Sequence, residues 1–386
     1  MPHVGGEIHD RPGRPLSPLA KNHAHTRVRD RHSSQKQSWR LRPPRLGVKV
    51  VHERAASIDT TARVVKARGG RSFRYDRLVV APGIDIKYDQ IEGYSPAAAE
   101  RMPHAYIAGA QTQLLKRQLE AMRDGGTVVV VPPNNPYRCP PGPYERVCMI
   151  AHYIKSRKPR SKIVVLDPKK TFSKQENFLE AFKKYYDGII ELNLTNEIDD
   201  FAVAKLDAQA MTLTTKEGRT LKADVANVIP NQRAGEIALQ AGLGEGDWCP
   251  VDPETFSSRK ARDVYVLGDA SLALDMPKSA FSANSQAKVV AADILAALAG
   301  KEKFKPSLRN TCWSMLAPND GVKLGAGYVA KAGKLEATGA FISKPGEDAA
   351  LRRATFEESV GWYSAFIDDV FATTARTPAS AARKRG

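Results

Sequence analysis

The sequence predicts an α/β fold built on a doubly wound parallel sheet, and two stretches carry this prediction. Residues 127–167 read as a buried strand, a helix and a second strand, which together make a βαβ unit. Residues 263–270 read as a strand that ends in Gly-Asp-Ala, and a long helix closed by a glycine follows at 282–300. A chain of 386 residues can hold two or three domains with a sizeable core.

The remaining elements follow in order from residue 46. Residues 46–59 alternate as a strand does, and a Gly-Gly turn joins the two strands of 64–83. Apolar residues at helical period predict that 97–126 is largely helical. Beyond Lys301 the pattern predicts a smaller mixed α/β region. In between we expect strands at 127–131 and 162–168, helices at 144–157 and 174–188, and an antiparallel meander over 202–230 with its hairpin turn at 216–219.

The two ends of the chain differ in composition from the middle. Residues 1–45 hold five of the eight histidines and six prolines without a helical or strand period, which predicts disorder, and 372–386 are also expected to be disordered. These two segments supply 11 of the 17 net positive charges. Because the excess lies in tails and no nucleic-acid motif accompanies it, we expect no nucleic-acid partner.

The 42% of hydrophobic residues are typical of a soluble globular protein. No apolar run is long enough to span a membrane, so no membrane anchor is expected. The N-terminus also lacks the apolar segment of a signal peptide.

Four cysteines are present, at Cys139, Cys148, Cys249 and Cys312. They form no CxxC pair and no histidine stands at metal-ligand spacing, so zinc is not expected. Four cysteines in so long a chain do not make a disulfide framework either, and one catalytic or redox pair remains open. We interpret Cys148, on the apolar face of a helix, as an inert hydrophobic residue.

Cys139 differs from the other cysteines because prolines and Gly142 flank it, which predicts a rigid exposed turn. Glu145 follows in the first turn of the next helix. The dipole at that helix N-terminus is expected to lower the pKa of a nearby thiol.

Two further strands end in turns that suit a nucleotide. Residues 75–83 end in Ala81-Pro82-Gly83, and 264–270 run into Gly268-Asp269. Glycine lets a backbone approach a ligand closely, and an acid can bond a ribose or ribityl hydroxyl. Such turns are also common as purely structural features of α/β proteins.

The sequence also contains the motifs RCPPGPYER, WCPVD, GDA followed by MPKSAFSANSQ, and NTCWSMLAP. Together these motifs resemble the flavoprotein subunit of flavocytochrome c sulfide dehydrogenase, in the family's order from about residue 46 to about 371. The resemblance implies an α/β fold with two nucleotide-binding-type domains (Rossmann-like, three-layer), the first incomplete, plus a smaller C-terminal α/β domain. The implied division is a remnant of the FAD-binding domain at 46–107, a second Rossmann-like domain with a redox loop at 108–230, a return to the FAD-binding domain at 231–300, and the C-terminal flavin-binding domain at 301–371.

The resemblance also implies a function, namely FAD-dependent oxidation of sulfide with electrons passing to a c-type cytochrome subunit. By the same correspondence Cys139 and Cys312 form a redox-active disulfide near the flavin, and Glu145 is the acid/base residue. The family works in the periplasm, which is therefore the expected location. Implied to hold FAD are Ala81, Pro82, Gly83, Gly268, Asp269, Met276, Pro277, Lys278 and Ser279.

The resemblance explains why prolines follow the strand at 127–131. A glycine turn binds NAD(P)H there in related enzymes, whereas prolines offer no N–H groups to a pyrophosphate. We therefore expect no NAD site, with Asp167 as a remnant of the ribose-binding acid and Cys249 as a structural residue.

The family begins with a strand, a GxGxxG turn and a helix, none of which is found at 1–45. We expect that segment to be out of frame, which would weaken FAD binding. Two alternatives remain open, a sulfide:quinone oxidoreductase-like flavoprotein and an inactive truncated homologue that only binds a partner.

Overall fold

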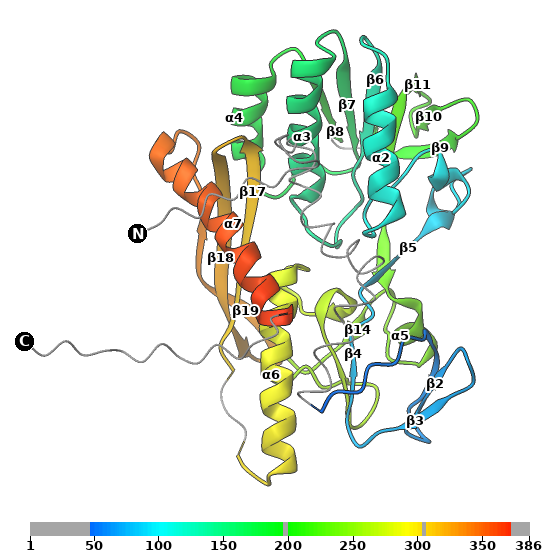
Figure 1. The fold of residues 1–386 in the computed structure, drawn as a ribbon, viewed down its shortest axis with the longest axis vertical. Coiled ribbons are helices and arrows are strands. Elements are labelled where there is room, and N and C mark those ends of the chain that lie inside the picture. Colours follow the sequence, from blue (N-terminus) through cyan, green and yellow to red (C-terminus); the bar gives the residue numbers. More distant parts are fainter. Residues whose placement is uncertain (1–46, 196–199, 303–305, 372–386) are drawn as a thin grey trace, which may run out of the picture.

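The computed structural model describes residues 47–195, 200–302 and 306–371, so the segments predicted to be disordered, 1–45 and 372–386, lie outside the described residues. Figure 1 shows three parts: a layered α/β part in its upper half, a second part around a long helix in its lower half, and a sheet with one helix along the left side. The predicted α/β class is confirmed.

A four-stranded parallel sheet forms the centre of the upper part. Its order is β12–β6–β7–β8, with β6 at Thr127–Val131, β7 at Lys162–Asp167, β8 at Ile190–Leu194 and β12 at Val225–Val228. The residues of β12 are all buried, as is typical of a strand covered on both faces. The sequence placed this segment at the end of an antiparallel meander, which is wrong because its four buried residues fit the parallel sheet instead.

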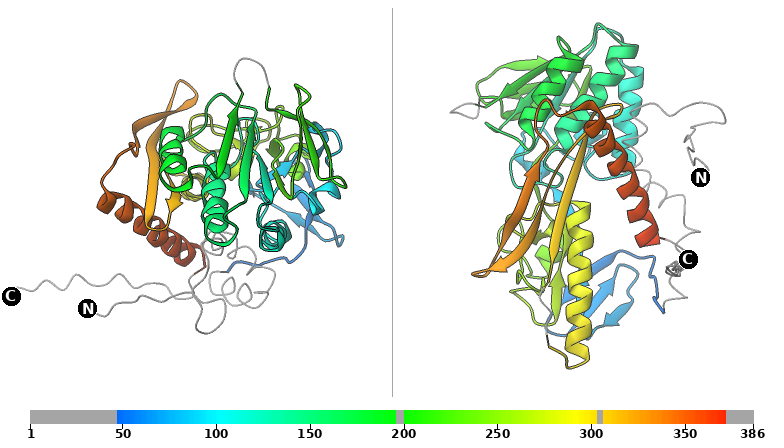
Figure 2. Two further views of the ribbon diagram at one scale, coloured as in Figure 1. Left: turned by 90° about the horizontal axis from the view of Figure 1, so that it is seen from above. Right: turned by 90° about the vertical axis from the view of Figure 1, so that its left-hand side faces the viewer.

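Helices cover one face of this sheet and the meander covers the other. Helices α2 (Ala110–Ala121), α3 (Gly142–Arg157) and α4 (Gln175–Tyr186) pack on Val128, Val130 and their neighbours, and Figure 2 shows them on one side of the strands. The antiparallel sheet of β9 (Val203–Asp207), β10 (Thr212–Thr215) and β11 (Thr220–Lys222) packs against Val129 and Val131. The upper part therefore has three layers.

The lower part has a much smaller parallel sheet. Strands β4 (Leu78–Val80) and β15 (Val264–Val266) pair with each other, and in the described residues β4 has no second neighbour. Val79 on β4 is 44% exposed. The edge that a further strand would cover in a complete doubly wound sheet is thus open among the described residues.

Short strands and one long helix complete the lower part around a shared core. They are the antiparallel sheet of β1 (Ala55–Asp59), β2 (Val64–Ala67) and β3 (Ser72–Arg74), the pairs β5 (Ile84–Ile86) with β13 (Gln232–Ala234) and β14 (Cys249–Pro250) with β16 (Ser271–Leu272), helices α5 (Glu236–Gln240) and α6 (Ala280–Leu298), and the single turns η2 (Tyr88–Gln90) and η4 (Gly268–Ala270). The single turn η3 (Ala98–Glu100) packs in the core of the upper part instead.

Two predicted elements are shorter than expected. The strand predicted at 46–59 is confined to β1, and the helix predicted at 97–126 consists of η3 and α2 with irregular backbone between them. In the second case Pro103 removes a backbone donor and the chain bends through Ala105, which has φ of +50°.

The C-terminal part joins the other two. Strands β17 (Leu308–Ala317), β18 (Asp320–Lys331) and β19 (Lys334–Ile342) form an antiparallel sheet, and helix α7 (Ala349–Phe371) packs on β17 and β18. Strand β17 contacts α3 and α4 in the upper part and α6 in the lower part. Figure 1 shows this sheet running alongside both parts.

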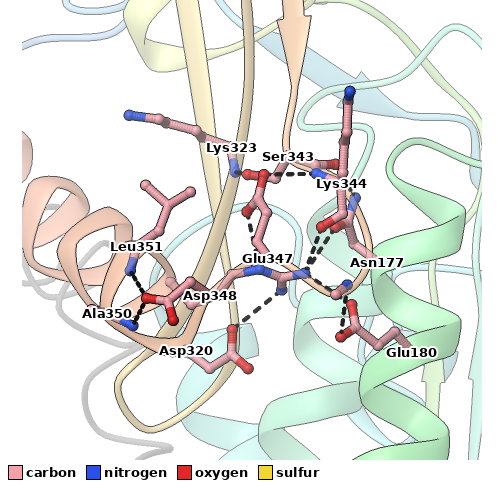
Figure 3. Close-up of polar contacts among 12 residues, drawn as sticks. Asn177, Glu180, Asp320, Lys323, Ser343, Lys344, Glu347, Asp348, Ala350 and Leu351 are labelled. Atoms are coloured by element: carbon pink, nitrogen blue, oxygen red, sulfur yellow. Dashed lines mark hydrogen bonds and ion pairs between the residues drawn. The ribbon is translucent and has the colours of Figure 1, made fainter.

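A buried arginine fastens α7 to the upper part (Figure 3). The guanidinium of Arg352 forms ion pairs with Glu180 on α4 at 2.8 Å, Asp320 on β18 at 3.3 Å and Glu347 at 3.0 Å. Its side chain is 5% exposed. Because the cluster takes one partner from each neighbouring element, it holds α4, the C-terminal sheet and α7 together.

Two absences hold across the described part of the chain. None of its helices is both long enough and apolar enough to cross a membrane. It also contains no group of three or more His, Cys, Asp or Glu side chains that could hold a metal ion.

Candidate active site

Cys139 lies in the loop between β6 and α3, residues 132–141, here called the redox loop. Its φ of +53° is in the left-handed region, which costs a non-glycine residue about 1–2 kcal/mol. Three hydrogen bonds hold it there: its N–H donates to the Lys278 carbonyl at 2.8 Å, and its carbonyl accepts from Gly142 N–H at 2.8 Å and from the Tyr106 hydroxyl at 3.0 Å. The surroundings thus fix the direction of the thiol.

Gly142, the first residue of α3, lets the thiol come close to the helix. A Cβ at this position would lie 3.1 Å from Cys139 Sγ and 2.8 Å from the Tyr106 hydroxyl oxygen. A larger residue would therefore push Cys139 and Tyr106 away from α3.

Cys312 on β17 meets Cys139 across the junction of the three parts. The two side chains are hydrogen-bonded to each other, both are half-buried, and all four cysteines of the chain are free thiols. From its residues alone, the sequence left open which cysteines pair. The structure brings together the two that the resemblance had named.

The two thiols differ in acidity. The hydrogen bond from Cys139 and the charge of Lys174 hold the pKa of Cys312 below its usual value, against the effect of burial. The pKa of Cys139 is raised, because it donates that bond and is buried close to Glu145. We expected the helix dipole to lower the pKa of Cys139, and this is wrong: its partner is the more acidic thiol.

Glu145 lies in the first turn of α3 and faces β17. Its Oε1 accepts a hydrogen bond from the Met315 N–H at 2.9 Å. Burial raises the pKa of Glu145 to about 7, although the Met315 bond and the Lys174 charge oppose the shift. A carboxyl group with such a pKa can take up and release a proton near neutral pH.

Lys174, the residue before α4, was not predicted from the sequence. Its Nζ donates to the Cys312 carbonyl at 2.7 Å and to Ser314 Oγ at 2.8 Å. A lysine at the start of an amphipathic helix ordinarily faces solvent, so no pattern in the sequence indicated a buried one.

A cavity of about 500 Å³ opens beside the two thiols. Its polar wall includes Cys139, Glu145, Asp269, Ser279 and Cys312. Its other wall is aromatic: Trp362 on α7 stacks on Phe366, Trp313 and Phe281, with ring centroids 5.3, 5.4 and 5.7 Å apart. The cavity thus combines two sulfurs, an acid and a flat apolar surface large enough for a ring system.

The predicted FAD turns lie on the same side as the redox loop. Gly268 has φ of +72° and Gly83 has φ of +74°, which glycine adopts without strain. Asp269 accepts a bond from Arg138 Nε at 2.7 Å, and Arg138 Nη2 also lies 3.2 Å from the position of a Cβ on Gly83. Arg138 of the redox loop therefore bridges the two turns.

Of the remaining residues predicted to hold FAD, only Ser279 lines the cavity. Ser279 lines the cavity and caps α6 by accepting a bond from the Ser282 N–H at 3.0 Å. Met276 is buried in the core, and Lys278 Nζ turns back to the carbonyls of Asp269 and Ser271. Ala81 is exposed, Pro82 packs on Gly235, and Pro277 does not line the cavity.

The described residues fit the flavin end of FAD. Asp269 and Ser279 sit at the cavity, and the N-terminus of α6 offers backbone N–H groups beside it. No strand–GxGxxG–helix unit for the pyrophosphate occurs in the described ranges, and the segment expected to be out of frame lies outside them.

Three other residues discussed from the sequence, Cys148, Cys249 and Asp167, lie in the protein interior and do not line the cavity. Cys148 and Cys249 are fully buried in hydrophobic clusters, and burial raises the pKa of both thiols. Asp167 bonds Lys169 Nζ at 2.7 Å and the Tyr144 hydroxyl at 2.5 Å. It is thus part of a buried ion pair.

Two family models match this chain. Residues 112–230 match "Sulfide dehydrogenase [flavocytochrome c] flavoprotein chain, central", and residues 304–371 match "Flavocytochrome c sulphide dehydrogenase, flavin-binding". The second match, together with the fold, assigns FAD as the cofactor.

Mitochondrial sulfide:quinone oxidoreductases are among the curated relatives that match. The protein from Mus musculus is 20% identical over 236 residues, 58% of this chain and 51% of its own length. The protein from Schizosaccharomyces pombe is 23% identical over 268 residues, 66% of this chain and 55% of its own length. The chain thus spans about half the length of these relatives.

Solved structures share the fold. The sulfide:quinone oxidoreductase of Aquifex aeolicus is 17% identical with a TM-score of 0.59, covering 86% of this chain and 81% of that one. A ferredoxin reductase from Rhodopseudomonas palustris is also 17% identical, with a TM-score of 0.53 and coverage of 76% and 73%. Residues 112–230 and 304–371 are thus similar to the central and flavin-binding regions of the flavoprotein chain of flavocytochrome c sulfide dehydrogenase.

Proposed function

We propose that this chain oxidises hydrosulfide through a redox pair formed by Cys139 and Cys312, with FAD as cofactor and a c-type cytochrome as electron acceptor. One observation carries the proposal: two thiols from distant parts of the sequence are hydrogen-bonded to each other at the wall of a cavity. The pair comes from a strained loop and from a strand that joins the two halves of the molecule.

The first step starts from the oxidised pair, with a disulfide between Cys139 and Cys312. Hydrosulfide attacks Cys139 Sγ, so that a new S–S bond forms there while the disulfide breaks and Cys312 leaves as a thiolate. One negative charge enters with hydrosulfide and one remains on Cys312, which balances the step. Cys312 is the leaving group because the thiol with the lower pKa leaves faster.

Glu145 accepts and releases the proton of the sulfur atom bound to Cys139. As a carboxylate it can accept the proton of the Cys139 persulfide, and its pKa of about 7 lets it release that proton again near neutral pH. The flavin, when bound, supplies two-electron acceptor chemistry next to the dithiol.

The sulfide:quinone oxidoreductase relatives support a second candidate for the acceptor, a quinone. The substrate and the cysteine pair would be the same, and only the acceptor would differ. Reduction of cytochrome c or of a soluble quinone by the sulfide-treated protein separates the two. The periplasmic location implied by the resemblance stays a prediction.

The proposal is tested by adding sulfide to the FAD-reconstituted full chain under anaerobic conditions and following the flavin absorbance near 450 nm. We expect bleaching by wild type and by Cys249→Ser, whose thiol lies in the core, but none by Cys312→Ser. Bleaching by Cys312→Ser at the wild-type rate would contradict the role of the pair.

A further inference from the structure

A buried ammonium group lies beside the two thiols. The whole Lys174 residue is 3% exposed, and both acceptors of its Nζ, the Cys312 carbonyl and Ser314 Oγ, belong to the strand that carries the Cys312 thiol. These two bonds fix the ammonium against β17. They supply neutral oxygens and no negative charge.

The charge of this ammonium has no carboxylate in contact with it among the described residues. Lys169 offers a comparison five residues earlier, because its Nζ is also buried but pairs with Asp167 at 2.7 Å. A buried cation without a counter-charge is unfavourable. The groups whose charges act on Lys174 are Cys312, Glu145 and Cys139, in that order of strength.

The backbone at Lys174 adds a second cost. Its φ of +60° lies in the left-handed region, where glycine or asparagine would be favoured. A lysine that is both buried and strained points to a role for its charge at this position.

We propose that Lys174 is a positioning residue whose ammonium is the counter-ion of the Cys312 thiolate in the reduced pair. The inference rests on the proposed function in one respect, that Cys139 and Cys312 are the redox pair. When the disulfide breaks, the negative charge appears on Cys312, next to a cation already held in place. The reduced state is thereby favoured over the disulfide, which makes the disulfide the stronger oxidant.

The titratable groups that act on Cys312 come from four elements. They are Cys139 of the redox loop, Glu145 of α3, Lys174 before α4 and Tyr328 of β18, whose own pKa burial raises. Cys139 donates a hydrogen bond to Cys312 and Glu145 repels a negative charge there, so Lys174 is the cation of the set. Neutralising Lys174 should therefore raise the pKa of the Cys312 thiol, whereas the loss of a lysine elsewhere should not change it.

The test is the pH dependence of Cys312 alkylation by iodoacetamide in the reduced full chain, quantified by peptide mass spectrometry without FAD or sulfide. Lys174→Met should raise the midpoint of alkylation by about one to three pH units, the effect of one nearby opposite charge. Lys174→Arg keeps the charge and should stay close to wild type. Lys170→Met removes an exposed ammonium four residues earlier and should leave the midpoint unchanged.

A folded Lys174→Met protein with the wild-type midpoint would overturn the proposal. Cooperative thermal unfolding establishes that a variant is folded, and Lys174→Gln, which keeps a donor for the Cys312 carbonyl without the charge, replaces Lys174→Met if that variant does not fold. Equilibration with glutathione gives a second readout, in which the neutral variants should hold more disulfide than wild type. Neither readout involves sulfide, so a shifted midpoint in a protein that fails to oxidise sulfide would refute the proposed function alone.

Discussion

Glu145 illustrates how the fold sets the chemistry of a single side chain. Its place in the first turn of α3 would ordinarily favour the ionised form, because a helix N-terminus attracts negative charge. Burial against β17 outweighs this and raises the pKa of Glu145 from its ordinary value of 4.5 to about 7. The raised pKa suits the Glu145 carboxyl group to proton transfer. It also means that the ionised carboxylate lowers the stability of the folded protein.

Replacing Glu145 with Gln keeps an acceptor for the Met315 N–H and removes the charge. In wild type the folded state binds the Glu145 proton more tightly than the unfolded state, so this residue lowers the free energy of unfolding as pH rises from about 4.5 to about 7. We expect the variant to lose that decline, measured by urea unfolding across this range. Sulfide-dependent flavin reduction should fall about 100-fold. An unchanged pH profile of stability would show that Glu145 is not buried as described.

The residues of the site were predictable to different degrees. Cys139 and Glu145 stand out in the sequence because prolines and a helix start surround them. Lys174 could not be found in this way, since its burial depends on β17 crossing the start of α4. The acidity of Cys312 likewise depends on a partner that only the fold brings near.

At the scale of elements, the redox loop shows why a strand followed by a helix need not bind a dinucleotide. Prolines occupy several of its positions, and the N–H groups of Asn134, Arg138 and Cys139 are already bonded to Asn231, Gln232 and Lys278. A pyrophosphate needs free N–H groups at this turn. The N–H groups of this loop therefore hold the Cys139 backbone in place and are not available to bind an anion.

We therefore expect NADH and NADPH not to bind at this loop. Isothermal titration of the full chain with either nucleotide should give no heat of binding at micromolar concentrations, and neither should bleach the reconstituted flavin. Micromolar binding that a substitution in the loop, such as Arg138→Ala, abolishes would contradict this account.

Two of the four strands in the parallel sheet of the upper part, β6 and β7, were predicted; no strand was predicted at β8, and β12 was assigned to the meander. Strands β6 and β7 follow from their apolar runs on either side of a helix, whereas β12 is separated from its neighbour β6 by about a hundred residues of other structure. Its short apolar run resembles the meander strands before it. Only the tertiary pairing distinguishes them.

At the scale of the whole molecule, the C-terminal sheet must stay fixed to the upper part, since it carries one thiol and the redox loop carries the other. Arg352 provides the fixed point through its three carboxylate partners. The adjacent Arg353 is exposed and pairs along α7 with Glu357. The two neighbours are therefore a matched pair for testing what the buried cluster contributes.

Arg352→Met should lower the free energy of unfolding by about 3–5 kcal/mol, because it leaves the buried Asp320 and two partly buried carboxylates without their cation. Arg353→Met should change it by less than about 1 kcal/mol. Urea unfolding measures both. Equal effects of the two substitutions would show that the cluster does not hold the parts together.

The central claim is that Cys139 and Cys312 form the pair that receives sulfide. Its most direct test is to treat the oxidised full chain with one equivalent of hydrosulfide, alkylate it, and map the cysteine peptides by mass spectrometry. Before treatment we expect a Cys139–Cys312 disulfide with Cys148 and Cys249 free. Afterwards Cys139 should carry one additional sulfur atom and Cys312 should be alkylated as a thiol. Four free thiols in the oxidised, denatured protein, or no added sulfur on either cysteine of the pair, would contradict the account.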